Sequence, residues 1–191
     1  MARKPRDPGL NSYVHVMNRG VQRSDIFREQ QDRITFIRIL EQSLDKFNCE
    51  LIAYCLMTNH YHLLLKAGDV PFYNVLRHFQ SRYAVHFNHK YEKTGHLFES
   101  RYVSRIIDSS SSLLEVSRYI HNNPVKAGMV RNPIDYPYSS YSAFVNSKVK
   151  SLANPTPILD LLGPGDNRLI YKHFVEMGQE DPDEIEMIAL E

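Results

Sequence analysis

The order of apolar patterns along the 191 residues predicts an α+β fold, in which an antiparallel sheet carries helices on one face. Two observations support this prediction. Short stretches in which apolar and polar residues alternate, as in strands, flank longer stretches with an apolar residue every three or four positions, as in helices. In addition, two of the strand-like stretches are separated only by Thr58 and Asn59, which favours a hairpin of antiparallel strands.

The first half of the pattern consists of a strand, a helix and the hairpin. Two sets of side chains alternate along residues 12–20, as they do on the two faces of a strand, and the stretch ends at a glycine. We therefore expect a first strand there. Residues 49–57 and 60–66 are the two arms of the hairpin. Between them and the first strand, residues 32–47 have the spacing of an amphipathic helix, with apolar side chains at Ile34, Ile37, Leu40, Leu44 and Phe47.

The second half repeats the helix and strand and adds a further helix. Residues 72–91 predict a long helix, residues 101–108 a strand, and the serines at 109–112 can cap a helix over residues 113–122. The order strand, helix, strand, strand, helix, strand is that of a ferredoxin-like split βαβ sandwich. The long helix should bury one stripe of side chains: Val75, Phe79, Tyr83 and Phe87.

The remainder of the chain predicts an appendage to this sandwich. Residues 132–141 are typical of a loop, and residues 155–178 of short helices around a Gly-Pro-Gly turn. We therefore expect a main domain over residues 1–141 and an acidic C-terminal helical extension over residues 142–191.

Composition limits the class of protein. The chain has 42% hydrophobic and 24% charged residues, which is typical of a globular protein. Residues 1–8 are charged where a signal peptide needs apolar residues, and no apolar run approaches the ~18 residues of a membrane-spanning helix. We expect a soluble, cytoplasmic protein without a membrane partner. Cys49 and Cys55 lack zinc or redox spacing, which argues against a disulfide scaffold.

Charge is distributed unevenly along the chain, although the formal net charge is only +1. Residues 1–131 contain 19 Lys and Arg against 12 Asp and Glu, a net charge of +7, whereas residues 132–191 contain 4 against 10, a net charge of −6. This distribution favours a basic main domain that binds a polyanion and carries an acidic extension. The alternative is a chance division between solvated surfaces.

Two histidines one residue apart are the first candidate for a functional site. His60 and His62 lie on the second arm of the hairpin, where residues i and i+2 project from the same face and Tyr61 points into the core on the other. We expect that face to be the one away from the core helices. Neutral imidazoles fixed on a strand are ready metal ligands. The alternative is an ordinary surface or core role, which we expect for most of the other histidines, including His15.

Tyr119 and Asn123 are the second candidate. They are four residues apart and therefore neighbours on one face if the helix continues through both. Pro124 disfavours a helical conformation for Asn123, so the pattern leaves this continuation open. The alternative is that Tyr119 packs on the core and Asn123 is a cap.

Together these stretches resemble a known family. The matching segments are VHVMNRG, CLMTNHYHLLLK, SRYAVHFNHKYEKTGHLFESRYVS, SRYIHNNPVKAGMV and DYPYSSY, in the family's order from Val14 to Tyr141. The chain resembles the single-tyrosine HUH transposases of bacterial insertion sequences, and most closely the REP-associated tyrosine transposases. It departs from the pattern at Phe98 and Tyr138, where relatives often carry tryptophan, and at Glu99, where glutamine is expected.

The resemblance implies the chemistry and the role of each site residue. It implies that His60 and His62 are ligands of a divalent metal, Mg²⁺ or Mn²⁺, that Asn123 supplies a further ligand, and that Tyr119 is the nucleophile. A divalent ion offsets the charge of a phosphodiester, and a tyrosine with a reference pKa of about 10 needs such help or a base, which the sequence does not identify. The implied activity is a DNA transposase that cleaves and rejoins one strand through a covalent 5′-phosphotyrosine, without a nucleotide cofactor.

The substrate implied by the resemblance is single-stranded or hairpin DNA. Alternatives are a domesticated, REP-type hairpin-binding protein with little catalysis, and a metal-dependent nuclease that uses water. A monomer using its own tyrosine and a homodimer using its partner's both remain open. The side chains that we expect to contact DNA are Arg3, Lys4, Arg6, Arg77, Arg82, Lys90, Lys93, His96, Arg101, Arg105 and Lys126.

Overall fold

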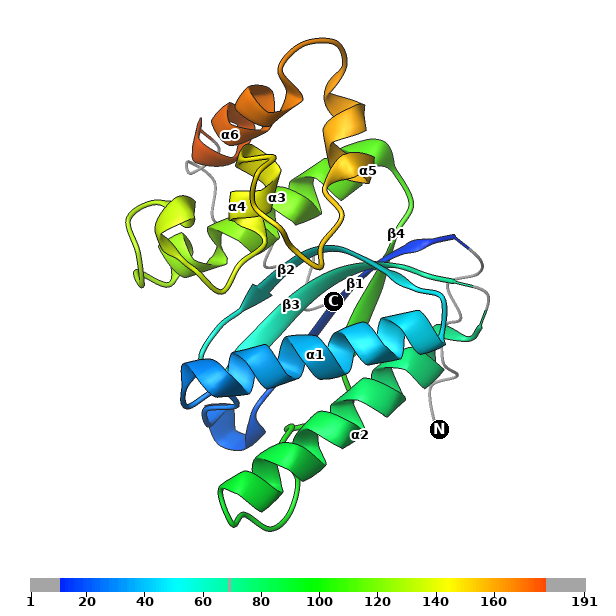
Figure 1. The fold of residues 1–191 in the computed structure, drawn as a ribbon, viewed down its shortest axis with the longest axis vertical. Helices are drawn as coiled ribbons and strands as arrows, with labels where there is room; N and C mark the ends of the chain where they lie inside the picture. Colours follow the sequence, from blue (N-terminus) through cyan, green and yellow to red (C-terminus); the bar gives the residue numbers. More distant parts are fainter. Residues whose placement is uncertain (1–10, 69, 178–191) are drawn as a thin grey trace.

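A computed structural model describes residues 11–68 and 70–177 of the chain (Figure 1). Its sheet and the helices around it are β1 (Tyr13–Arg19), α1 (Gln30–Lys46), β2 (Glu50–Leu56), β3 (His60–Lys66), α2 (Phe72–Lys90), β4 (Val103–Ile107) and α3 (Ser110–Lys126). The segment that follows contains α4 (Tyr141–Val145), α5 (Thr156–Leu159) and α6 (Asn167–Met177). Three 3₁₀ turns connect these elements: η1 (Val21–Arg23), η2 (Pro133–Asp135) and η3 (Asp160–Leu162).

The four strands form one antiparallel sheet in the order β2-β3-β1-β4, which confirms the predicted split βαβ sandwich. The predicted hairpin is β2 and β3, and β1 lies between β3 and β4. In this register His62 lies opposite Cys55 on β2 and Met17 on β1, while His60 lies opposite Arg19. Because directly opposite residues of an antiparallel pair point to the same side, this register decides which side chains share a face with the two histidines.

Helices α1 and α2 cover one face of the sheet (Figure 1). Val16, Tyr61 and Leu63 point from the strands into the core under these helices. The predicted stripe of α2 is confirmed, since Val75, Phe79, Tyr83 and Phe87 are all fully buried. The predicted stripe of α1 is wrong at Ile34, which is 50% exposed; Phe36 is fully buried instead.

The other face of the sheet is covered by α3 and by the short helices that follow it (Figure 1). Cys55 and Leu64 pack there with Ile120 of α3, Phe144 of α4 and Tyr171 of α6. The sequence predicted helices after the sheet but not the face that they cover. The predicted boundary after Tyr141 falls within α4, and the described part of the acidic extension shares this second core.

Helix α3 continues through Pro124 to Lys126, so Tyr119 and Asn123 do lie on one helix. Proline removes one backbone N–H from the last turn. The side chain of Asn123 adds a donor there, because its Nδ2 bonds the carbonyl oxygen of Tyr119 at 2.9 Å, and the N–H of Ala127 bonds the carbonyl of Asn123 at 2.9 Å.

Some predictions lie outside the described residues: the basic arm with Arg3, Lys4 and Arg6, and the acidic end from residue 179 onward. Within residues 11–68 and 70–177, none of the helices combines the length and apolarity needed to cross a bilayer.

Candidate active site

The second face of the sheet brings the predicted histidines and the predicted tyrosine together within one chain. His60 and His62 project from β3, with ring centroids 5.1 Å apart. Helix α3 lays Tyr119 against them, with its ring centroid 5.4 Å from that of His62 and nearly perpendicular to it. The prediction that the two histidines face away from α1 and α2 is confirmed, because they share their face with Cys55 and Leu64.

Hydrogen bonds fix the tautomer of His60. The Nδ2 of Asn59 donates to the carbonyl oxygen of Arg23 at 3.1 Å, so the Oδ1 of Asn59 is the atom turned toward His60, at 2.7 Å from its Nδ1. A carbonyl oxygen only accepts, so His60 carries its proton on Nδ1 and a lone pair on Nε2. Burial, together with the positive charge of Arg19, lowers the pKa of His60 to about 4, which keeps the ring neutral near pH 7.

His62 has a second imidazole as its neighbour. Its Nδ1 lies 3.1 Å from the Nε2 of His15, and the two rings are nearly parallel with centroids 5.3 Å apart. Burial lowers the pKa of His62 well below its ordinary value, and the nearby His15 and His60 act in the same direction. His62 is therefore neutral near pH 7, as a metal ligand must be.

The donor set suits a divalent ion with open positions. Both histidines are neutral and have Nδ1 engaged, which is the usual arrangement of an imidazole that ligates through Nε2. Within the described ranges, no group of three His, Cys, Asp or Glu side chains could hold a metal, so water, phosphate or amide oxygens would complete the shell. Asn123 uses its Nδ2 on Tyr119, which leaves Oδ1 as the only side-chain atom that could ligate. The metal and the ligand role of Asn123 stay predictions.

Buried hydrogen bonds to the C-terminal helices hold the segment of α3 that carries Tyr119. His121 contacts the hydroxyl of Tyr171 through Nδ1 and that of Ser140 through Nε2, both at 2.8 Å. The Nδ2 of Asn122 donates to the carbonyl of Val175 at 2.9 Å. Burial lowers the pKa of His121 to about 3, so the ring is neutral. The position of Tyr119 over the histidines therefore depends on Ser140, just before α4, and on α6.

Two of the predicted DNA-binding residues lie beside the site. Arg105 of β4 lies opposite His15 in the register and so points to the same face as the histidines. The Nζ of Lys126, at the end of α3, is 5.3 Å from the centroid of the Tyr119 ring. Both are exposed, so the face that carries His15, His62 and Tyr119 has positive charges at its edge.

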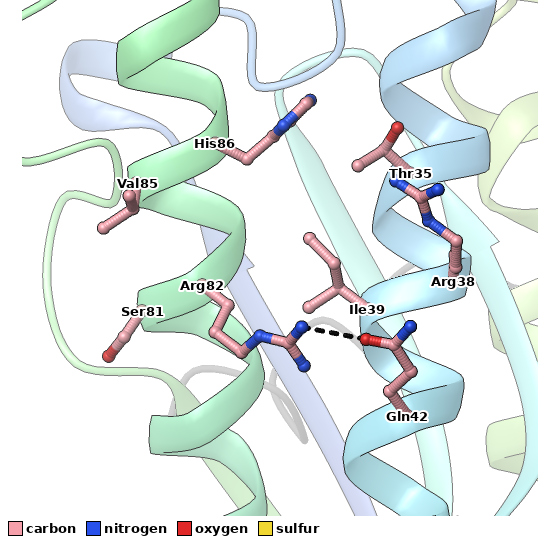
Figure 2. A pocket seen from close by; sticks show the side chains of 8 residues that line it. All are labelled: Thr35, Arg38, Ile39, Gln42, Ser81, Arg82, Val85 and His86. Carbon is pink, nitrogen blue, oxygen red and sulfur yellow. Dashed lines mark hydrogen bonds between the residues drawn. The ribbon is translucent and has the colours of Figure 1, made fainter.

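Other predicted DNA-binding residues lie elsewhere. Arg77 and Arg82 are exposed on α2, on the far side of the sheet, and Figure 2 shows Arg82 bonded to Gln42 of α1 across a groove between the two helices. Lys90 pairs with the carboxylates of Glu29 and Asp32. The remaining three are exposed between α2 and β4: Lys93, His96 and Arg101. The contacts of Lys90, Lys93, His96 and Arg101 with DNA stay predictions. Arg77 and Arg82 lie across the sheet from Tyr119, so we expect them to contribute little to DNA bound beside it.

His15 is the site residue that sequence reasoning missed. It is 7% exposed, it bonds His62, and its ring lies 6.0 Å from that of Tyr119. A signal was present in the sequence, because the central position of the first strand in a split βαβ sheet places its side chains beside those of the hairpin.

Comparisons with known proteins agree with this fold. The family model of the IS200-like transposases matches residues 10–123, more than half of the chain. A protein of Haemophilus influenzae classed as a REP-associated tyrosine transposase is 26% identical in an alignment 121 residues long that covers 57% of this chain and 68% of that protein. The structure of a REP-associated tyrosine transposase bound to a REP hairpin has a TM-score of 0.62 and 18% identity, over 81% of this chain and 89% of that one.

Proposed function

Because the chain belongs to the family of IS200-like transposases, we propose that it cleaves and rejoins DNA by attack of Tyr119 on a backbone phosphate. One observation carries the proposal. The ring of Tyr119 contacts that of His62, and His62 in turn neighbours His60, so the residue types needed for the reaction meet in one chain.

The proposed step exchanges one phosphate ester for another. The phenol of Tyr119 releases its proton to solvent and its oxygen bonds to phosphorus, while the bond from phosphorus to the 3′ oxygen breaks and the departing 3′ oxygen takes up a proton from solvent. The products are a 5′-phosphotyrosine and a free 3′ hydroxyl. Attack by a 3′ hydroxyl on the phosphotyrosine reverses the step and rejoins the strand. Because the ester bond is kept on the protein, this chemistry supports strand transfer rather than hydrolysis.

The neutral rings of His60 and His62 would hold a divalent ion, Mg²⁺ or Mn²⁺. When bound, such an ion offsets negative charge on the phosphate and so favours attack by an oxygen nucleophile. Lys126 adds a positive charge over the ring of Tyr119, with its Nζ 5.3 Å from the ring centroid, and would stabilise negative charge on a phosphate attacked by that tyrosine.

We propose single-stranded or hairpin DNA as the substrate. The similar structure described above holds a REP hairpin, and this chain presents Lys126 beside Tyr119 and Arg105 on the same face of the sheet, opposite His15. Attack by a single tyrosine needs only one strand, and exposed basic side chains near the site can follow its phosphates.

The site would work in cis, since His62 and Tyr119 of the same chain are already in contact. No residue from a second copy is needed to bring the nucleophile to the histidines. A chain with an intact tyrosine and damaged histidines therefore cannot rescue a chain with the reverse defect.

The test is a denaturing gel with labelled hairpin DNAs, each carrying a single-stranded flank. The expected result is a labelled band at the size of a protein–DNA adduct that needs Mg²⁺ or Mn²⁺, disappears with EDTA, and is absent in both Tyr119→Phe and His62→Ala. An adduct of normal yield from Tyr119→Phe would overturn the assignment of the nucleophile. Free 5′-phosphate ends without an adduct would indicate a nuclease that uses water, and binding without cleavage would indicate a DNA-binding protein.

A further inference from the structure

A third imidazole lies directly behind the histidine pair. His15 of β1 is diagonal to His62 of β3, because His15 lies opposite Leu64 in the register and His62 lies opposite Met17. The Nε2 of His15 and the Nδ1 of His62 are 3.1 Å apart, and the two rings are inclined by only 18°. His15 is 7% exposed and His62 is 2% exposed, so water does not compete freely for this bond.

This hydrogen bond has two possible proton arrangements. A neutral imidazole carries one N–H and one lone pair, so one ring of the pair must donate and the other accept. If His62 donates from Nδ1, its lone pair lies on Nε2. If His62 accepts at Nδ1, its Nε2 carries the proton and cannot bind a cation.

His60 shows which arrangement the site requires. Its Nδ1 faces the carbonyl oxygen of Asn59, which only accepts, so the lone pair of His60 lies on Nε2. Two neighbouring imidazoles can bind one ion only if both lone pairs are available. His62 therefore has to match His60, and its partner at Nδ1 has to be an acceptor.

We propose that His15 is a positioning residue, which accepts the Nδ1 proton of His62 and thereby holds the Nε2 lone pair of His62 ready for a divalent cation. This inference rests on the proposed function, since it assumes that His60 and His62 bind the metal. His15 then carries its own proton on Nδ1. Its edge contact with Tyr119, at 6.0 Å between ring centroids, places the same ring against the nucleophile.

The test measures Mn²⁺ binding to the purified full chain without DNA. The electron paramagnetic resonance signal of free Mn²⁺ decreases as the ion binds, and this decrease gives the affinity. His15→Phe retains a buried ring beside His62 but offers no acceptor, whereas the side-chain oxygen of His15→Gln can accept the same proton. Removal of the acceptor behind a ligating histidine should weaken Mn²⁺ binding by about 10- to 100-fold. We expect this loss in His15→Phe and a recovery to within about threefold of wild type in His15→Gln.

The outcomes separate this inference from the proposed function. If wild type binds Mn²⁺ and His62→Ala does not, the metal site stands; equal affinity of His15→Phe and wild type then overturns the role of His15. Equal impairment of His15→Gln and His15→Phe would also overturn it, since a loss of packing would be the cause. If wild type binds no Mn²⁺, both the metal part of the proposed function and this inference fail.

A second measurement does not depend on whether the variants fold. Two-dimensional ¹⁵N–¹H spectra of the histidine side chains in the wild-type protein, recorded without metal, identify which nitrogen of His62 carries the proton. We expect the proton on Nδ1 of His62 and of His60. A proton on Nε2 of His62 would overturn the proposal.

Discussion

Acid should destabilise this protein through a buried histidine that lies outside the proposed metal site. His121 is fully buried, and its pKa is about 3 in the folded chain against 6.5 for the free side chain. The folded state therefore stays unprotonated at His121 between pH 7 and pH 5, while the unfolded state takes up a proton. Because the unfolded state binds more protons, the free energy of unfolding falls as the pH falls.

The magnitude follows from the difference in bound protons. Averaged from pH 7 to pH 5, the unfolded state holds about 0.7 proton more at this residue, and one proton over one pH unit is worth about 1.4 kcal/mol, so the loss is about 2 kcal/mol. Urea unfolding followed by circular dichroism at pH 7, 6 and 5 measures it, with His121→Phe as the matched variant. The variant should be less stable than wild type at pH 7 but should lose about 2 kcal/mol less on acidification. Parallel losses in the two proteins would refute a neutral, buried His121.

Three further predictions concern charged residues. Lys126→Ala should slow adduct formation about tenfold in single-turnover assays, because it removes a positive charge beside Tyr119, and Lys126→Arg should retain most of the rate. Arg105→Glu should weaken hairpin binding, measured by fluorescence anisotropy, about tenfold or more. The control Arg82→Glu, on the far side of the sheet, should change the affinity by less than about threefold. Equal effects of the two variants would contradict the proposal that DNA binds on the face that carries Tyr119. Asp32→Ala should lower the free energy of unfolding by about 3 kcal/mol in urea titrations. It removes a fully buried carboxylate that accepts hydrogen bonds from Lys90 and from two backbone N–H groups, and so leaves these donors without their acceptor.

The fold could be predicted from the sequence because strand and helix periods are local properties. The alternation around His60 and His62 and the stripe of α2 depend only on residues close in sequence, and both predictions are confirmed. The stripe of α1 was partly wrong because an apolar residue on a helix is not bound to face the core. Ile34 lies one position before Thr35 and two before Phe36, and the helix is rotated to bury those two side chains instead.

The second core and the third histidine could not be predicted in this way. Which face α3 and the C-terminal helices cover depends on contacts far apart in sequence, such as those of Phe144 with the sheet. His15 depends on the order of strands, since β1 must lie beside β3 before its side chain can meet His62, 47 residues away. Pro124 left the helix open for the opposite reason. A local rule disfavours helix at Asn123, but the structure keeps it there, with bonds from the side chain of Asn123 and the N–H of Ala127 around the proline.

Mass spectrometry of the covalent adduct tests the central claim most directly. The protein is incubated with hairpin DNA and Mn²⁺, digested with trypsin and nuclease, and searched for peptides that carry a nucleotide. The chain contains 12 tyrosines, so the position of the modification is informative. The account predicts a nucleotide joined through its 5′ phosphate to Tyr119 and to no other tyrosine. A nucleotide on a different residue, or a 3′-linked phosphate on Tyr119, would contradict it.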